Sequence, residues 1–469
     1  MKAGAARISL EPPLGLPMIG FVRMTEPARD YGLPLEATAL VLDGEARVVL
    51  VGVDTLGIQA PEVDRLRERV AEAAGTKPSH VLLNWNHTHL APPGGRSFIR
   101  ALAQVDDTEL TTRLETYVDD LHAAIVAVAR DAAERLEPAR VVWGLGSLPD
   151  AVNRRERRDG RVVLGWNPEG AVDRSVTVLQ ARRPDESAIG TLVGYGCHTV
   201  TTGPDVPIYS ADYPGALRDA VRTWTGGECV FFQGAAGNVL PLVCFTGSEE
   251  EAMHVGRGLA LEALHAVAQK RAWPVRIERE GWGSVTPISL YRRHGEDAPE
   301  QPIAVAEERA VFPLQPLPAV EEIGRMRAEF EAAVEASRAE GPARVRTAAY
   351  HARWAQQTEE KIRAGTAPTE LDGPITAVRV GDGVIATGPG EIFTEIGLAV
   401  KERSPVRATL YAGYTNGIVT YFPTAAEFPL GGYEPDYGNR SFGQVAQVTP
   451  ESEAILTETA VRLVRGLFA

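Results

Sequence analysis

Apolar residues occur in short continuous stretches along the first part of the chain, with polar residues between them. Residues 37–42 and 47–53 are rich in β-branched residues and are split at Asp43-Gly44, which predicts a hairpin of buried strands. Residues 61–74 carry apolar residues at helical spacing, and residues 81–85 are typical of another buried strand. This alternation of strands and helices predicts an α/β fold with mixed sheets.

The same pattern continues along the chain. Residues 108–136 and 249–270 have the amphipathic pattern of long helices. Further strands are expected at 141–145, 162–164, 175–181, 191–197 and 229–233, the first three separated by polar, arginine-rich loops. We expect the Pro389-Gly390-Glu391 turn to open a helix that reaches Lys401, which places Glu391 at a helix N-terminus.

Residues 304–365 differ from their surroundings because they are rich in Ala, Glu and Arg. Two helices are expected there, at 320–339 and 343–364, with a break at Gly341-Pro342. We therefore expect a helical hairpin inserted into one domain that spans residues 1–469.

Composition and charge exclude several classes of protein. The net charge of −14 and the lack of a basic cluster with interleaved aromatic residues exclude a nucleic-acid partner. Three cysteines cannot form a disulfide framework or a thiolate zinc cluster. No stretch is long and apolar enough for a transmembrane segment. The first residues lack a signal peptide, so we expect a cytoplasmic protein, although a mature secreted chain would also fit. The sequence leaves open whether it forms a homo-oligomer.

The most distinctive chemistry lies just after the strand expected at 81–85. His87 and His89 are separated by one residue, so in extended backbone their side chains point to the same side. Neutral imidazole is a good zinc ligand, and the following Pro/Gly turn would hold the loop stiffly. The alternative is a pair of histidines hydrogen-bonded to backbone carbonyls. Spacing alone does not choose between a metal site and this alternative.

Three other positions could join such a site. His198 ends an apolar strand, Glu391 follows a Pro-Gly turn, and a tyrosine-rich segment from Tyr411 leads to Tyr421 and Tyr433. Phenols can bind a metal or donate to an oxyanion. Each position also has an ordinary structural interpretation, as a hydrogen-bonded core histidine, a first-turn glutamate or packed aromatic residues.

Several segments, taken in chain order, resemble the catalytic domain of the neutral/alkaline ceramidase family. The family's paired-histidine turn is similar to His87–Gly94, and its Asn-Arg-Ser-Pro segment to Asn153-Arg154-Arg155. Its second zinc histidine falls on His198. Its acidic segment is similar to Ser210–Gly215, and its Gln-Ser-Asn-x-Gly-Asp turn to Phe232–Asn238. The resemblance covers nearly the whole chain. It implies mixed β-sheets flanked by helices in a neutral-ceramidase-like catalytic domain.

The resemblance also implies a metal and a reaction. The zinc (Zn²⁺) ligands would be His87, His198, Glu391 and Tyr421. Zinc held by such ligands activates a water and polarises a carbonyl. The implied activity is that of a zinc-dependent amidohydrolase, which cleaves the carbon–nitrogen bond of a linear N-acyl amide. The partner would be a small-molecule amide substrate.

Roles for neighbouring residues follow from the same resemblance. His89 would donate to the oxyanion or carry a proton to the leaving amine, and Tyr433 would donate to the same oxyanion. Arg154 would bind a polar substrate group or orient a tyrosine. Asp54 and Asn238 are candidates to orient the zinc histidines from behind.

The chain departs from the family pattern at several positions. Leu90 and Leu240 stand where the family has serines, and Asn238 replaces an aspartate. A serine nucleophile is therefore disfavoured. The family's C-terminal immunoglobulin-like domain is expected to be missing. No apolar groove for a lipid is visible in the sequence, so ester hydrolysis or hydrolysis of a soluble or natural-product amide on the same site is the alternative. The remaining alternative is that the protein binds a ligand without catalysing a reaction.

Overall fold

The first apolar stretches form a five-stranded sheet in the computed structural model, which describes residues 1–24, 26–103, 107–283 and 288–469. Its order is β5 (Val81–Trp85), β4 (Arg47–Val53), β3 (Leu35–Asp43), β1 (Lys2–Leu10) and β6 (Glu137–Pro138). β3 and β4 pair antiparallel, which confirms the expected hairpin, and β4 and β5 run parallel. Parallel pairing brings the carboxyl ends of β4 and β5 to one edge.

A second sheet packs against the first. Its order is β13 (Glu228–Gln233), β11 (Ala188–Tyr195), β10 (Ser175–Arg182) and β7 (Arg140–Ser147). β11 and β13 are parallel neighbours, so their carboxyl ends also lie together. Leu40 and Leu50 of the first sheet share one buried apolar cluster with Leu192 and Phe232 of the second. This cluster is the core between the two sheets.

A third sheet completes the core. It consists of β17 (Ile303–Pro313), β18 (Glu370–Val380), β19 (Gly383–Thr387) and β21 (Thr409–Ala412), in that order. Val378 and Leu410 connect it to the same apolar cluster. Short ladders pair β2 (Asp30–Tyr31) with β12 (Ile208–Tyr209), β8 (Ala151–Arg158) with β9 (Arg161–Asn167) and β14 (Val239–Pro241), and β20 (Glu391–Ile392) with β22 (Tyr421–Phe422).

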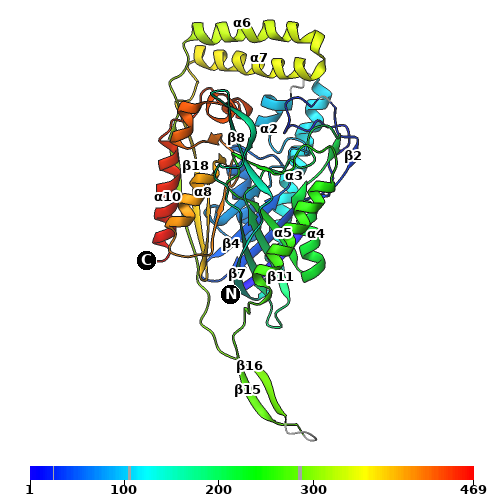
Figure 1. Cartoon of the computed structure of the whole chain (residues 1–469), viewed down its shortest axis with the longest axis vertical. Helices are drawn as coiled ribbons and strands as arrows, with labels where there is room; N and C mark the ends of the chain where they lie inside the picture. Colours follow the sequence, from blue (N-terminus) through cyan, green and yellow to red (C-terminus); the bar gives the residue numbers. More distant parts are fainter. Residues whose placement is uncertain (25, 104–106, 284–287) are drawn as a thin grey trace.

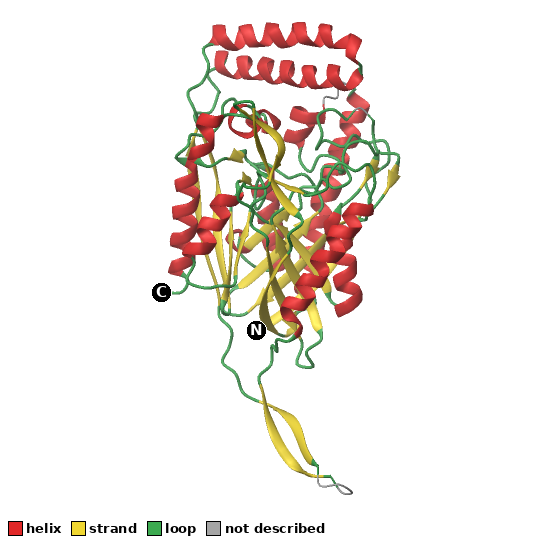
Figure 2. Cartoon of the chain, in the orientation of Figure 1, coloured by secondary structure: helices red, strands yellow, loops and turns green. Residues whose placement is uncertain are grey.

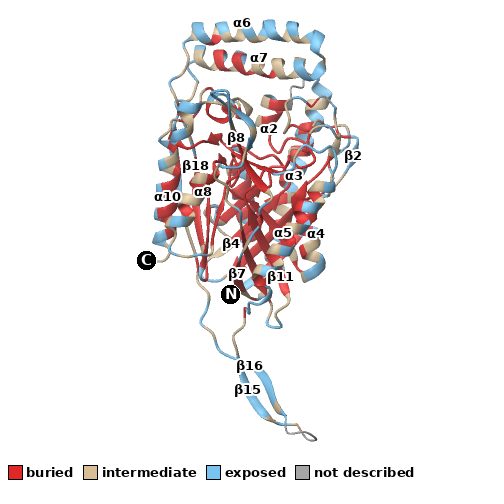
Figure 3. Ribbon diagram, in the orientation of Figure 1, coloured by how far each residue is buried: buried red, intermediate tan, exposed pale blue. Residues whose placement is uncertain are grey.

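Helices cover the outer faces of the sheets (Figure 2). They are α1 (Glu62–Ala74) and α3 (Thr108–Glu134) on the first sheet, α4 (Tyr213–Thr225) and α5 (Glu250–Ala268) on the second, and α8 (Thr394–Arg403) and α10 (Ser452–Gly466) on the third. The central strands are the most buried part of the molecule (Figure 3). Mixed sheets flanked by helices are the expected fold class.

Two extensions project from opposite ends of this body (Figure 1). One is a helical hairpin of α6 (Val320–Ser337) and α7 (Pro342–Arg363), which confirms the helices expected there. The other is an arm formed by β15 (Val275–Trp282) and β16 (Ser289–Gly295). Residues 303–313, at the start of the expected helical insertion, instead form β17. That residues 304–365 are an insertion within a single domain stays a prediction.

Two local expectations are wrong. Residues 151–158 lie in a region expected to form arginine-rich loops, yet they form β8, because Arg154 and Arg155 are buried against carboxylates. Glu391 is not in the first turn of a helix, because α8 begins at Thr394 and Glu391 pairs with Tyr421 in a short parallel bridge. Among the residues that the structure describes, no helix combines the length and apolar character needed to cross a bilayer.

Candidate metal centre

Two histidines follow the carboxyl ends of parallel strands and meet above the sheets. His87 lies two residues after β5, and its amide donates to the carbonyl of Thr55 at 3.1 Å. His198 lies three residues after β11, and its amide donates to the carbonyl of Val239 at 3.1 Å. The His87 φ of 64° lies in the left-handed region that non-glycine residues rarely adopt. Such strain is typical of positions where a side chain must be aimed at a site.

Backbone carbonyls fix the tautomer of both rings. His87 Nδ1 lies 2.8 Å from the carbonyl oxygen of Leu56, and His198 Nδ1 lies 2.7 Å from that of Ala236. A carbonyl oxygen can only accept, so each Nδ1 carries the proton. Burial and the Arg154 charge lower the pKa of His198 to about 4, so this ring is neutral at pH 7. In a neutral ring with Nδ1 protonated, Nε2 presents a lone pair, which is the usual state of a metal-binding histidine.

Glu391 lies between the two rings. Its Oε1 is 3.4 Å from His87 Nε2 and its Oε2 is 3.2 Å from His198 Nε2. All three side chains are buried. The lone pair of neutral His198 Nε2 faces a carboxylate oxygen that repels it, and a cation between these atoms would turn the repulsion into binding. Two ligands of a tetrahedral zinc are about 3.3–3.6 Å apart, close to the observed separations. The residues present could therefore hold a metal ion.

His89 lies beside this pair. The ring-nitrogen ligand atoms of His87, His89 and His198 all lie within 4.8 Å of one another, so the three could hold a metal ion. Neither nitrogen of His89 has a hydrogen-bond partner among the described residues, and its ring packs at 4.7 Å from that of Phe21. Burial, with the neighbouring His87 and His198, lowers the pKa of His89 well below its ordinary value. His89 is therefore a neutral ring with both nitrogens available.

Arg154 connects the histidines to two tyrosines. Its Nη1 lies 3.2 Å from His198 Nε2, and its Nη2 donates to the Tyr421 hydroxyl at 3.3 Å. Its Nε donates to Glu434 at 2.7 Å. Tyr433, at the start of the short helix α9 (Tyr433–Asp436), packs against Tyr421 with ring centroids 5.5 Å apart. Burial and the Glu391 charge raise the pKa of Tyr421 well above its ordinary value, so the phenol is protonated.

The two residues expected behind the histidines have other partners. The carboxylate of Asp54 receives two hydrogen bonds from Arg218, at 2.8 and 2.5 Å, and one from the amide of Glu36. The side chain of Asn238 accepts from the amide of Thr394 and donates to Glu395. Asn238 nevertheless lies between Ala236 and Val239, whose carbonyls contact His198 Nδ1. Its turn positions the ring through the backbone.

Sequence reasoning missed several groups of the site. Tyr414 donates to Glu391 Oε2 at 3.3 Å, and Glu434 forms ion pairs with both Arg154 and Arg155. The tyrosine-rich segment and the glutamate next to Tyr433 were the available signals for these residues. The carbonyls of Leu56 and Ala236 have no sequence signal, because any residue supplies one.

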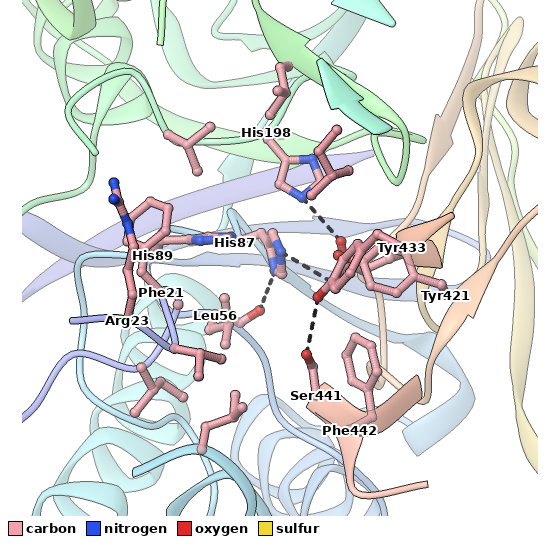
Figure 4. A pocket seen from close by; sticks show the side chains of 18 of the residues that line it. Phe21, Arg23, Leu56, His87, His89, His198, Tyr421, Tyr433, Ser441 and Phe442 are labelled. Carbon is pink, nitrogen blue, oxygen red and sulfur yellow. Dashed lines mark hydrogen bonds and ion pairs between the residues drawn. The ribbon is translucent and has the colours of Figure 1, made fainter. Parts of the chain in front are cut away.

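A cavity of about 330 Å³ opens above these residues (Figure 4). Its walls are mostly apolar and include Ile19, Phe21, Leu56, Phe98, Leu102, Leu164, Val200, Leu240, Phe245 and Phe442. A second cavity of about 480 Å³ shares Leu164, Leu240 and Phe245 with the first and is also lined by Trp166. The apolar groove that the sequence did not reveal is therefore present beside the histidines.

Solved structures that share this fold include two ceramidases. The neutral ceramidase from Pseudomonas aeruginosa aligns over 99% of this chain and 74% of its own chain, with a TM-score of 0.65 and 18% sequence identity. A ceramidase complexed with C2 aligns over 100% and 75%, with a TM-score of 0.66 and 17% identity. No protein-family model and no curated protein matches this chain. The chain thus has a neutral-ceramidase-like fold, and at these identities the likeness shows the fold alone.

Proposed function

We propose that this protein is a zinc-dependent amidohydrolase that cleaves the carbon–nitrogen bond of a linear N-acyl amide. The observation that carries the proposal is the pair of histidine Nε2 atoms at 3.4 and 3.2 Å from the two oxygens of Glu391. The neutral-ceramidase-like fold supports the choice of reaction. We further propose that residues 1–469 form one catalytic domain and that residues 304–365 are a helical insertion in it.

The proposed zinc ligands are His87, His198, Glu391 and Tyr421. The ring tautomers of the histidines and the bridge that pairs Glu391 with Tyr421 support this set. Zinc bound there would supply an activated water and polarise the scissile carbonyl. The closeness of His89 supports a second set in which three histidines bind the metal. The two sets differ in whether removal of His89 releases zinc.

Three other residues have proposed roles in the reaction. Neutral His89 has one N–H and one lone pair, so it can take a proton as water adds to the carbonyl and deliver it to the leaving amine. Tyr433 would donate a hydrogen bond from its hydroxyl to the developing oxyanion. Its pKa is raised by burial, which keeps that proton on the phenol. Arg154 would hold the hydroxyl of Tyr421 in place, as its hydrogen bond to that hydroxyl suggests.

The lining of the cavity narrows the range of proposed substrates. Its apolar walls would bind an apolar acyl chain, because burial of each CH₂ group contributes about 0.8 kcal/mol. This favours N-acyl amides with a hydrocarbon acyl chain over very polar soluble amides. The acyl chain of a corresponding ester would pack against the same apolar walls. Ester hydrolysis is therefore the second candidate reaction.

A panel of matched substrates tests the proposal. Amides of one amine with short and long acyl chains, the corresponding esters and a water-soluble peptide-like amide would be assayed with the zinc-loaded protein. We expect kcat/KM to rise with acyl-chain length and activity to be lost with a chelator and restored by zinc. Hydrolysis of the ester alone would replace the amidohydrolase proposal with an esterase. Undiminished activity after complete removal of metal would contradict both.

A further inference from the structure

The arm formed by β15 and β16 projects from the end of the body opposite to α7 (Figure 1). A two-stranded hairpin on its own is at best marginally stable in water. The arm nevertheless exposes large apolar side chains, with Ile277, Trp282 and Tyr291 at 66%, 60% and 62% exposure. Exposed apolar groups gathered on one projecting element are typical of a surface that binds a partner.

The register of the arm separates two faces. Ile277 lies opposite Arg293, and Arg279 lies opposite Tyr291, so these four share one face, and the Arg279 guanidinium stacks 3.9 Å above the ring of Trp282. Charged pairs occupy the other face, where Arg292 binds Glu280 at 2.7 Å and Arg276 binds Glu278 at 2.9 Å. On one face the charged side chains thus pair with one another, whereas the other face carries apolar side chains and two arginines.

We propose that the apolar face of this arm binds the body of a second copy of this chain and holds the two copies as a dimer. Residues 275–295 contain four arginines and two glutamates, a net charge of +2. The whole chain carries −14, which leaves −16 on the remainder. The arm is therefore a basic segment on an acidic protein, and the acidic body of another copy is a complementary surface.

Two observations favour the body of the second copy over other partners. Arg279 and Arg293 lie on the apolar face, so two arms packed face to face would bring like charges together. The apolar residues extend along this face, from Ile277 near the base of the arm through Tyr291 to Trp282. A membrane anchor would need them only at the tip, whereas a long apolar face suits packing along a protein surface. Exchange of arms between two copies also gives closed two-fold symmetry.

The oligomeric state of the full-length protein tests this proposal by light scattering coupled to size-exclusion chromatography. We expect wild type at twice the chain mass of 50.5 kDa and a triple variant, Ile277→Glu/Trp282→Glu/Tyr291→Glu, at the single-chain mass. The matched control, Arg276→Ser/Glu278→Ser, changes the other face and should stay dimeric. A second variant replaces residues 275–295 by an Asn-Gly turn. This is feasible because Glu296 donates to the carbonyl of Pro274 at 3.0 Å. It should also be monomeric, with the melting temperature of the body retained.

Two outcomes would overturn the proposal: a wild-type protein that is monomeric at every concentration reached, and a dimer that survives removal of the arm. If the monomeric wild type also binds vesicles of anionic phospholipid through the arm, the arm is a membrane anchor instead. None of the arm residues named above lines either cavity beside the histidines, so monomeric variants should retain their zinc content.

Discussion

His87 and His89 have opposite surroundings although only one residue separates them. His87 Nδ1 is bound by a backbone carbonyl and its Nε2 faces Glu391, whereas neither nitrogen of His89 has a partner among the described residues. A buried polar group without a partner costs free energy, and such costs are tolerated where a ligand or substrate completes the hydrogen bond. This contrast supports the proposed roles of His87 as a metal ligand and of His89 as a proton carrier.

The variant His89→Gln separates these roles. We expect zinc content to stay at the wild-type value while kcat falls by about 10²- to 10⁴-fold, because a general acid–base group is lost. Metal analysis and steady-state kinetics on the same sample measure both quantities. Loss of zinc from this variant would instead place His89 among the ligands and favour the three-histidine set.

Asp54 provides a second test at a single position. Asp54→Ala would leave the buried Arg218 without its closest carboxylate, so we expect the free energy of unfolding to fall by about 3–5 kcal/mol. Denaturant unfolding measures this free energy, and Glu335→Ala, which breaks an exposed pair with Arg338, should change it far less. Equal effects of the two substitutions on the free energy of unfolding would refute the stabilising role of the Asp54–Arg218 ion pair. A large loss of zinc affinity in folded Asp54→Ala would support its predicted role behind the histidines.

The residue types of the site could be predicted, but their partners could not. His87, His198, Glu391 and Tyr421 come from segments far apart in sequence and become neighbours only through parallel strand pairing. A resemblance of motifs supplied them as a set. The carbonyl partners of the histidines depend on the backbone path, which has no residue signature. The apolar cavity was missed for the same reason, since residues as distant as Phe21 and Phe442 form its walls.

At the scale of elements, a salt bridge joins α8 to the second sheet. Lys401 Nζ lies 2.5 Å from Asp173 Oδ2, just before β10, and Ser175 donates to the same carboxylate. Burial acts to raise the pKa of Asp173, but Lys401 and the hydrogen bonds outweigh it, so the pKa is lowered. The unfolded chain then binds this proton more readily than the folded one.

The pH dependence of stability follows from this shift. The contribution of Asp173 is fully present above the ordinary carboxyl pKa of about 3.9 and is lost as the pH falls through the lower, folded pKa. We expect Asp173→Asn to lower the free energy of unfolding at pH 7. At acidic pH the difference in this free energy between the variant and the wild type should become smaller. Urea unfolding at a series of pH values measures this difference. A difference that is constant or widens towards acid would contradict the account.

Strongly patterned elements were predicted and weakly patterned ones were not. The β3–β4 hairpin and helices α3 and α5 follow directly from apolar periodicity. β1 lies inside the first sheet without such a pattern, because its small residues allow α3 to pack closely; a side chain at Gly4 would collide with the carbonyl of Ala132. Tertiary contacts decide such strands, and local propensity does not.

At the scale of the whole molecule, α7 lies at one end of the body and the arm lies at the other (Figure 1). Thr347 of α7 lines the cavity, and Tyr350 of the same helix lies within hydrogen-bonding distance of Ser441, which in turn contacts Tyr433. The helical hairpin thus contributes to the wall of the site. This separation places the proposed chemistry and the proposed dimer contact on different parts of the chain.

Metal analysis of purified variants tests the central claim most directly. We expect about one zinc per chain in the wild type, as a single mononuclear site requires. His87→Ala and His198→Ala should lose the metal, while His254→Ala, which changes an exposed histidine of α5, should keep it. Circular dichroism would confirm that each variant is folded. Zinc retained at the wild-type level in both site variants, or absent from the wild type after growth with zinc, would contradict the assignment of this site as a zinc centre.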